Sequence, residues 1–386
     1  MSALALFRIF AAALGAVVGS FANVCIHRLP RGESVVSPPS HCPSCGGPIA
    51  FYDNVPVVSW LLLGGRCRRC RTSISPRYPL VEAAMALLFL GAALIWGPSL
   101  DALRGALLAT TCVLLVGTDL SERLLPDEVT LGGLALALLL AAGGDLVRGT
   151  GGSFASGRTA DALLGAALGA GFLLAVRAAY SRLRGVEGLG LGDVKMIAMV
   201  GAFTGVAGVL LATLVGSLSG SVVGLAAAAL RRLSWLRVAR KLARDPGAAA
   251  AAAHRQGLLV GADGRIAAAG PDWGGIPGAA REGERLQDSS TTARPVEAVV
   301  RLVRRRKGSG APVDVGRLVL DDGDEYFRVF AARAVPAGDG CLVLLDRADI
   351  PFGVFLAVGA LVSFAAGRAL LLMAGLPVPS PTRLLP

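Results

Sequence analysis

The chain has 386 residues, of which 54% are hydrophobic and only 17% are charged. A soluble globular protein carries more charge than this, and the length exceeds that of one ordinary domain. The composition therefore excludes a soluble single-domain protein. It predicts a polytopic α-helical membrane protein with about eight transmembrane helices, which has the lipid bilayer among its partners.

The formal net charge of +11 could indicate a protein that binds nucleic acid. The arginines, however, gather in the polar segments between apolar runs, where they orient a membrane protein by keeping those segments in the cytoplasm. We therefore expect no nucleic-acid partner.

Eight apolar runs are candidate membrane helices, and several are shorter than the ~20 residues that a straight span needs. A cleaved signal peptide is the alternative for the first run, but no Ala-x-Ala site follows it, and the arginines beyond it would resist export. The runs are residues 3–22, 79–96, 103–118, 129–142, 163–179, 194–206, 207–230 and 352–373.

Basic residues cluster after the first, fifth and seventh runs. An alternating path with the amino terminus outside places all three clusters in the cytoplasm. The same path places Asp119 and Asp193 on that side, because they follow the third and fifth runs. Four arginines fall on the outer side of the membrane in this path, namely Arg8, Arg104, Arg148 and Arg158. They weaken the excess of positive charge on the cytoplasmic side without reversing it.

Two C-x-x-C pairs lie in the first polar segment, Cys42 with Cys45 and Cys67 with Cys70. This spacing is close to that of a four-cysteine zinc ribbon. Two disulfides are the alternative, but they need an oxidising compartment, and the expected cytoplasmic placement favours zinc. We expect His41 to be a bystander, because four thiolates already complete a closed site.

Residues 188–195 read Gly-Leu-Gly-Leu-Gly-Asp-Val-Lys and place Asp193 where a glycine-rich segment meets an apolar one. Asp119 follows another apolar run. Ionisable residues at membrane depth indicate function by default. Two carboxylates that face one water do not both ionise readily, so one can donate a proton while the other activates the water. This pattern predicts hydrolysis of an amide, with the glycines allowing a substrate strand to approach Asp193.

Each acid also has a structural alternative. Asp119 could end a helix at the interface, and Asp193 could cap the following one. Their place on one expected face, together with the glycine run, favours catalysis. Asp127, which follows Pro126, is more typical of a helix N-cap, and Glu82 is more typical of a structural acid.

The polar insertion at 233–349 begins with a basic stretch and the alanine run 248–253. Its remainder predicts an α/β module that resembles a PAS sensor domain in element order; the alternative is a structureless basic insertion. The expected elements are a hairpin over 257–270 around Asp263-Gly264, a helix at 296–305, and strands at 315–320, 326–334 and 341–345, with turns at 321–324 and 336–340.

Taken in order, these and further motifs resemble the bacterial type IV prepilin peptidases. The resemblance runs from about Gly15 to Leu230 and resumes at 350–353. The motifs that carry it are GSFANV at 19–24, RLP at 28–30, the two cysteine pairs, DNVP at 53–56, SWL at 59–61, RYPLVE at 77–82, Asp119 with Pro126-Asp127, GLGDVK at 190–195 and IPFG at 350–353.

Members of that family are aspartyl proteases of the GxGD class in the bacterial inner membrane. They remove the basic leader of prepilins and type II secretion pseudopilins on the cytoplasmic side, and many then methylate the new amino terminus with S-adenosylmethionine. By motif, the resemblance implies that Asp119 and Asp193 are the catalytic acids. It also implies that Cys42, Cys45, Cys67 and Cys70 bind the zinc of a cytoplasmic domain.

The insertion departs from the family pattern, which has a short loop there. We expect five parts: a first helix (1–23), a zinc domain (24–78), a six-helix catalytic core (79–232), the insertion (233–349), and a last helix with its tail (350–386). The same residues are compatible with two other functions. In one the chain is a membrane sensor with a vestigial protease core, and in the other the acids form a proton or cation pathway.

Overall fold

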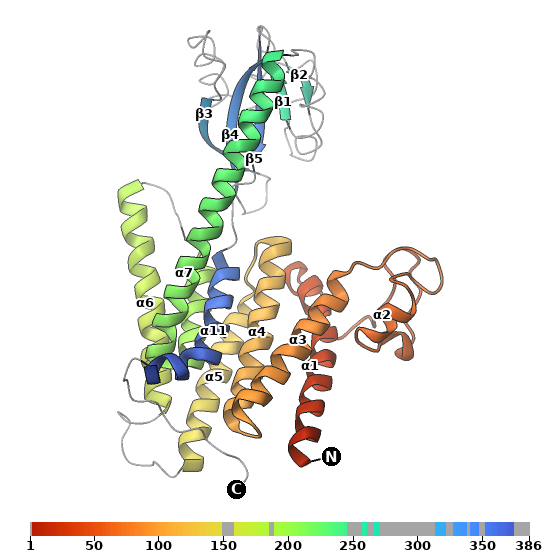
Figure 1. The fold of residues 1–386 in the computed structure, drawn as a ribbon, viewed down its shortest axis with the longest axis vertical. Coiled ribbons are helices and arrows are strands. Elements are labelled where there is room, and N and C mark those ends of the chain that lie inside the picture. Colours follow the sequence, from red (N-terminus) through yellow and green to blue (C-terminus); the bar gives the residue numbers. More distant parts are fainter. Residues whose placement is uncertain are drawn as a thin grey trace. The chain divides into compact units, whose positions relative to one another are not determined.

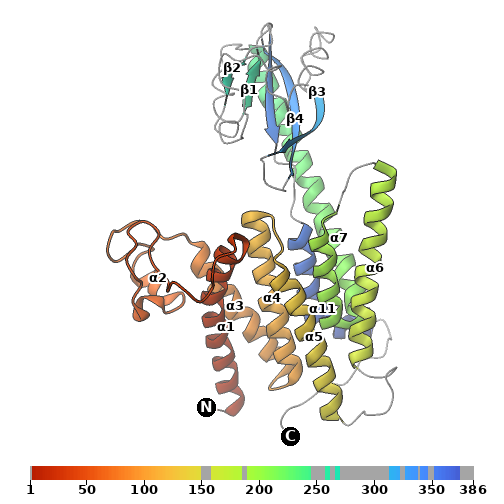
Figure 2. The same cartoon turned by 180° about the vertical axis from the view of Figure 1, so that it is seen from behind.

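The computed structural model of the protein describes residues 2–148, 158–184, 189–244, 257–260, 266–269, 313–321, 327–337, 340–346 and 352–373 (Figures 1 and 2). Contacts divide the chain into two compact units. Met1–Ser221 together with Pro351–Pro386 form the first, and Val222–Ile350 form the second.

The first unit is helical (Figure 1). Among the described residues, six stretches are long and apolar enough to cross a membrane, and the protein is a multi-pass membrane protein. The helices are α1 (Ala3–Arg28), the short α2 (Val58–Leu62), α3 (Arg77–Trp96), α4 (Leu100–Glu122), α5 (Asp127–Arg148), α6 (Arg158–Arg184), α7 (Leu191–Arg244) and α11 (Phe352–Met373).

Helix α4 is bounded by clear local signals. The Ser99 side chain accepts a hydrogen bond from the Ala102 N–H at 3.2 Å and caps the start of the helix. At the other end Arg123 adopts the left-handed conformation with φ of 59°, and its N–H donates to the Asp119 carbonyl. Helix α5 begins directly after Pro126. Asp119 therefore lies in the last turn of α4.

Helix α7 reverses direction at Gly205, which has the non-helical φ of 73° and ψ of −173°. A Cβ added to Gly169 of α6 would lie 2.8 Å from Val209 Cγ2 and 3.1 Å from the Ile197 carbonyl oxygen. In a straight helix those two residues would be about 18 Å apart along the axis. Helix α7 is therefore a hairpin, with a first limb at residues 191–204 and a second limb at 206–244. Two separate helices were expected here, with the break at 206 and 207.

Two side chains of opposite charge hold this reversal. Buried Arg104 of α4 donates to the carbonyls of Phe203 at 2.9 Å and Ala202 at 3.4 Å, which end the first limb. Asp161 of α6 accepts from the Val206 N–H at 3.1 Å, at the start of the second limb. Helix ends leave such groups without partners, and each charge matches the helix dipole that it meets.

Helix α11 packs antiparallel to α4 and to the second limb. A Cβ added to Gly353 would lie 2.8 Å from Asp119 Oδ2, and one added to Gly105 would lie 2.6 Å from Phe364. The Ser363 hydroxyl donates to the Gly208 carbonyl at 2.8 Å. The first turn of α11 therefore lies at the end of the bundle that holds Asp119. The largest buried core joins α4, α7 and α11 and includes Leu108, Leu115, Met196, Met199, Phe203 and Leu356.

The second unit contains one antiparallel sheet with the strand order β2-β1-β5-β4-β3. The strands are β1 (Gly257–Val260), β2 (Ile266–Ala269), β3 (Val313–Asp321), β4 (Phe327–Ala337) and β5 (Gly340–Asp346).

The described part of the insertion contains the strands that the sequence predicts, with two differences in their boundaries. β4 continues to Ala337 and pairs Pro336 with Cys341, so the expected turn at 336–340 is shorter. Helix α7 runs through Arg244, so the insertion begins as a helix instead of at a boundary after residue 232. The Asp263-Gly264 turn, the alanine run and the helix expected at 296–305 lie outside the described residues.

The reversal gives a first prediction. We expect Gly205→Ala to lower the thermal stability of the purified protein, because a φ of 73° is unfavourable with a side chain and the new Cβ would lie 2.0 Å from Asp161 Oδ2. Backbone strain of this kind costs about 1–3 kcal/mol. Thermal unfolding in detergent measures the effect. Gly132→Ala in α5 is the control, because an added Cβ meets no described residue within 4 Å. Equal melting temperatures for the two variants would contradict the proposed role of Gly205.

Candidate active site and metal centre

Asp119 is buried in the last turn of α4. Its carboxylate accepts a hydrogen bond from the Val354 N–H at the start of α11. Its Oδ2 atom is buried and has no hydrogen-bond partner among the residues that the structure describes. A buried polar oxygen without a partner is costly and uncommon in folded proteins. Asp119 is therefore a candidate site for chemistry.

Asp193 lies in the first turn of α7 and accepts a hydrogen bond from the Gly190 N–H. The segment before it is held by α6, because Arg177 donates to the Leu189 carbonyl at 2.6 Å. The two acids thus come from the end of one helix and the start of another.

The structure brings these two acids together. Their carboxylates interact electrostatically as like charges. Leu125 lies between the two acids' neighbours. It is 3.1 Å from a Cβ added to Gly192, which precedes Asp193, and 3.5 Å from a Cβ added to Gly353. The Cβ added to Gly353 would also contact Asp119. The pair lies at the end of the bundle where α4 ends and where α7 and α11 begin, as the sequence predicts for acids on one face.

The glycines before Asp193 differ in what surrounds them. Gly192 packs against Leu125, so its lack of a side chain serves packing and not the approach of a substrate. Of the described atoms, a Cβ added to Gly190 would have only Asp193 Oδ2, at 3.6 Å, and the Gly192 nitrogen, at 3.9 Å, within 4 Å. This position fits the expected open approach. Gly188 lies outside the described residues.

Two neighbours of the pair were not singled out as site residues from the sequence, Gly353 and Val354. They follow Pro351 at the start of the last apolar run, and a proline before a glycine at a helix start is the local signal that could have identified them. Leu125 carries no such signal, because an apolar residue before a proline is ordinary.

Asp127 is not part of the pair. It is the first residue of α5 instead of its N-cap, and its carboxylate accepts from Lys195 Nζ at 2.7 and 2.8 Å. The ion pair joins the starts of α5 and α7 and is exposed. Glu82, in α3, is a buried structural acid, because it accepts the Val57 N–H at 2.7 Å.

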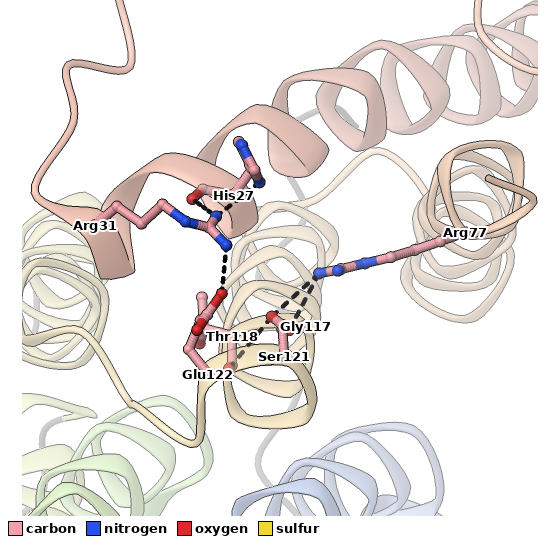
Figure 3. A network of polar contacts seen from close by, with 7 residues as sticks. All are labelled: His27, Arg31, Arg77, Gly117, Thr118, Ser121 and Glu122. Atoms are coloured by element: carbon pink, nitrogen blue, oxygen red, sulfur yellow. Dashed lines mark hydrogen bonds and ion pairs between the residues drawn. The ribbon is translucent and has the colours of Figure 1, made fainter. Parts of the chain in front are cut away.

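A polar side chain from the turn that follows α1 (Leu29–Arg31) and another from α3 fix the end of α4 next to Asp119 (Figure 3). Arg31 donates to the Glu122 carboxylate and to the His27 carbonyl. Arg77 donates to the Gly117 carbonyl at 3.2 Å and to the Ser121 hydroxyl at 3.4 Å. Cations near a helix carboxyl terminus are stabilising. The turn that carries Asp119 is therefore held from two sides.

The four cysteines also come together, with all their Sγ atoms within 4.8 Å of one another. Each pair forms a similar tight turn, in which the Cys42 N–H donates to Gly47 and the Cys67 N–H donates to Thr72. Zn–S bonds of 2.3 Å in a tetrahedron separate the sulfurs by about 3.8 Å. The Cys42 and Cys70 sulfurs are 3.8 Å apart. The geometry therefore fits a tetrahedral ion.

Two of the four thiols, Cys42 and Cys70, are shifted toward the form that binds metal, whereas the pKa of Cys45 is raised to about 11. A hydrogen bond between Cys70 and the Thr72 side chain, aided by the Thr72 N–H, lowers the pKa of Cys70 to about 6. Backbone hydrogen bonds from Cys45 and Ser44 lower the pKa of Cys42. Both shifts favour the thiolate, which is the form that binds metal. All four cysteines are free in this structure, which supports a metal site over the disulfide alternative. His41 contacts the Pro39 carbonyl and is not one of the grouped residues.

Two family models match the chain. The Bacterial Peptidase A24 N-terminal domain matches residues 13–96, which contain the four cysteines. The Type IV leader peptidase family matches residues 106–225, which contain both acids. No solved structure matches the chain.

Several curated relatives carry the name prepilin leader peptidase/N-methyltransferase. The one from Burkholderia pseudomallei (strain 1026b) is 37% identical over 243 residues, which cover 56% of this chain and 75% of the relative. The one from Aeromonas hydrophila is 38% identical over 56% of this chain and 79% of the relative. The one from Myxococcus xanthus (strain DK1622) is 38% identical over 57% of this chain and 63% of the relative.

The metal centre gives a second prediction. We expect the protein to purify with zinc and Cys67→Ser to lose most of it, because a four-thiolate site with one ligand removed binds zinc far more weakly. Metal analysis by mass spectrometry measures the content. His41→Ala is the matched control and should keep its zinc. Loss of zinc from His41→Ala, or full retention in Cys67→Ser, would show that the ligand set is different.

Proposed function

The chain belongs to the type IV leader peptidase family, and from this premise we propose that it is a membrane aspartyl endopeptidase. Its substrates are type IV prepilins or type II secretion pseudopilins, whose basic leader it removes at the cytoplasmic face of the bacterial inner membrane. It then N-methylates the new amino terminus. The relatives named for both activities support the assignment.

One observation carries the proteolytic part of the proposal. Asp119 and Asp193 come from distant parts of the chain and meet beside Leu125 and Gly353. Asp119 Oδ2 is buried and accepts no hydrogen bond from the described residues. An oxygen in this state is suited to hold or accept a proton. The described site thus offers two acids in close range.

The pair performs hydrolysis as a general acid and a general base. The ionised carboxylate takes a proton from a water molecule, and the water oxygen bonds to the scissile carbonyl carbon. The protonated carboxyl donates its proton to the carbonyl oxygen. When the carbonyl reforms, the C–N bond breaks and the leaving nitrogen accepts a proton. The two acids exchange roles in this step, so no metal or covalent intermediate is needed.

The membrane supplies part of the specificity. A prepilin has a basic leader followed by an apolar helix, so its scissile bond lies at the cytoplasmic boundary of the bilayer. We infer that the two limbs of α7 and helix α11 cross the membrane in addition to α1, α3, α4, α5 and α6. The reversal at Gly205 and the antiparallel packing of α11 support these eight crossings. With the amino terminus outside, both acids then face the cytoplasm.

Zinc has a structural role in this proposal. Four thiolates fill all four positions of a tetrahedral ion, so no position stays open for a substrate. The ion joins the turn that carries Cys42 and Cys45 to the turn that carries Cys67 and Cys70. The resulting cytoplasmic domain, expected at residues 24–78, includes the end of α1 and the first two residues of α3.

The methyl donor of the second activity is S-adenosylmethionine, which supplies an electrophilic methyl group to the freed amine. Within the described residues no glycine-rich turn joins a strand to a helix in the manner of nucleotide-binding folds. We therefore assign no residue to this cofactor and derive no step from it.

The insertion adds a PAS-like sensor module to the enzyme. Two strands, a long intervening segment and three further strands form one antiparallel sheet, which supports the resemblance in element order. The two acids are close together, so we favour an active enzyme over a sensor with a vestigial core. The five expected parts of the chain stand in this proposal, with α7 continuing through Arg244 into the insertion.

The acid pair gives a third prediction. We expect Asp119→Asn and Asp193→Asn each to lower the rate of leader removal by about a thousandfold or more, because neither amide can shuttle the proton. Cleavage of a purified prepilin in proteoliposomes, followed by mass spectrometry of its amino terminus, measures both cleavage and methylation.

Asp127→Asn is the matched control, because it changes an acid of the same region that is paired with Lys195 outside the site. It should cleave at a rate near that of the unchanged protein. Full activity in both the Asp119 and Asp193 variants would end the proposal.

A further inference from the structure

We propose that an apolar patch on the cytoplasmic domain docks into the headgroup layer of the membrane. The patch lies on residues 51–62, which include the short helix α2. We call it the interfacial patch, and its members are Phe51, Tyr52, Val55, Val58, Leu61 and Leu62.

The interfacial patch is exposed to an unusual degree. Phe51 is 88% exposed, Leu62 is 82% exposed and Leu61 is 65% exposed. Single exposed apolar residues are common, but a contiguous group of large ones marks a surface that binds a partner or a membrane. This group falls within twelve consecutive positions, 51–62, of one domain.

A strained turn ties the patch to the transmembrane helices. Val57 has φ of 62° and ψ of −50°, which is rare for a β-branched residue. The N–H of Val58 donates to the Pro56 carbonyl at 2.6 Å and closes the turn. The N–H of Val57 donates to the buried Glu82 carboxylate of α3 at 2.7 Å. Such strain persists only where the surroundings hold it.

The tether sets the depth of the patch. Glu82 lies five residues beyond Arg77, the first residue of α3, or about 7.5 Å further along the helix axis. Glu82 also accepts a hydrogen bond from Ser20 of α1, which precedes the end of that helix at Arg28. The interfacial region on each side of a bilayer is about 5–7 Å thick. Val57 is therefore held level with the interface instead of out in the cytoplasm.

The surroundings of the patch favour lipid over a protein partner. Helix α3, which holds the patch through Glu82, also exposes apolar side chains of its own, with Leu80 at 66% and Leu87 at 67%. Figures 1 and 2 both show the α2 segment on the side of α1 and α3 that faces away from α5, α6 and α7. No other described part of the first unit covers that side.

The charges of the domain agree with a lipid surface. Arg68 lies 5.7 Å from the Tyr52 ring centroid and forms an ion pair with Asp53 at 2.6 Å. Aromatic rings with arginines beside them are typical of the membrane interface, and arginines are attracted to anionic headgroups. Three further arginines of the domain are exposed, namely Arg66, Arg69 and Arg71.

The test uses the full-length protein in lipid nanodiscs that contain one-third anionic lipid. One probe is a phospholipid with a photoactivatable group near its glycerol, and the other is a water-soluble carbene precursor. Mass spectrometry maps the labels along the chain. We expect the lipid probe to label residues 51–62 and the water-soluble probe to label residues 32–40 in preference.

The double variant Phe51→Ser with Leu62→Ser should lower lipid labelling of residues 51–62 by about threefold or more, because it removes the two most exposed anchors. Val36→Ser is the matched control, since Val36 is 85% exposed in the same domain but lies outside the patch. Zinc content checks that both variants fold.

Water-soluble labelling of residues 51–62 at the level of residues 32–40 would overturn the proposal. Protection of residues 51–62 from the water-soluble probe that arises only after a prepilin is added would also overturn the proposal, because the patch would then bind the substrate. Protection that requires two copies in one nanodisc would instead assign the patch to an interface between chains. Labelling of residues 51–62 by the lipid probe, with one copy of the protein in each nanodisc and no prepilin present, supports the proposal.

Discussion

The alignment of α4 with the first limb of α7 decides whether two distant acids can meet. The two helices come close together at both ends. At one end Arg104 of α4 binds the last carbonyls of the limb, at Ala202 and Phe203. At the other end α4 carries Asp119 and the limb begins with Asp193 beside it. From residue 104 to 119 the helix rises about 22 Å, and from 193 to 203 about 15 Å, so the long arginine side chain spans the difference. A shift of one helical turn would separate the acids by about 5 Å.

Helix α11 adds the third wall of the site. Its first turn lies against Asp119, where Gly353 leaves no side chain between the backbone and the carboxylate and Val354 donates its N–H. Only residues 347–351 separate this turn from the last strand of the insertion, which ends at Asp346. The insertion therefore enters the chain between two elements that border the active-site end, the second limb of α7 and α11. Both acids precede the insertion in the sequence, whereas α11, which contacts Asp119, follows it.

The sequence was sufficient for features that depend on local pattern. Apolar runs located the helices, alternation and turn residues located four of the five strands closely, and residue type with spacing located both acids and the four cysteines. Long-range pairing was not accessible in this way. The sequence predicts Arg104 and Arg158 only as charges on the outer side that weaken the orientation rule. In the structure Arg104 caps the first limb, and Arg158 pairs with buried Asp101 at 2.9 Å. Nothing near them in the chain indicates these partners. The same holds for the Lys195 pair with Asp127 and for the contact of Leu125 with Gly192.

Three acids are buried in helices of the described bundle, and their hydrogen bonds distinguish their roles better than their positions do. Glu82 accepts from the Val57 N–H and from Ser20, and it holds a strained turn of the cytoplasmic domain. Asp101 is paired with Arg158 through both of its oxygens. Asp119 alone among them keeps an oxygen that no described group satisfies. A structural acid offsets its burial with partners, whereas an acid that exchanges protons with a substrate must keep one oxygen that no protein group already satisfies. All three acids lie near a helix end in the sequence, so position alone does not distinguish their roles. The contacts identify Asp119 as the one that is suited to catalysis.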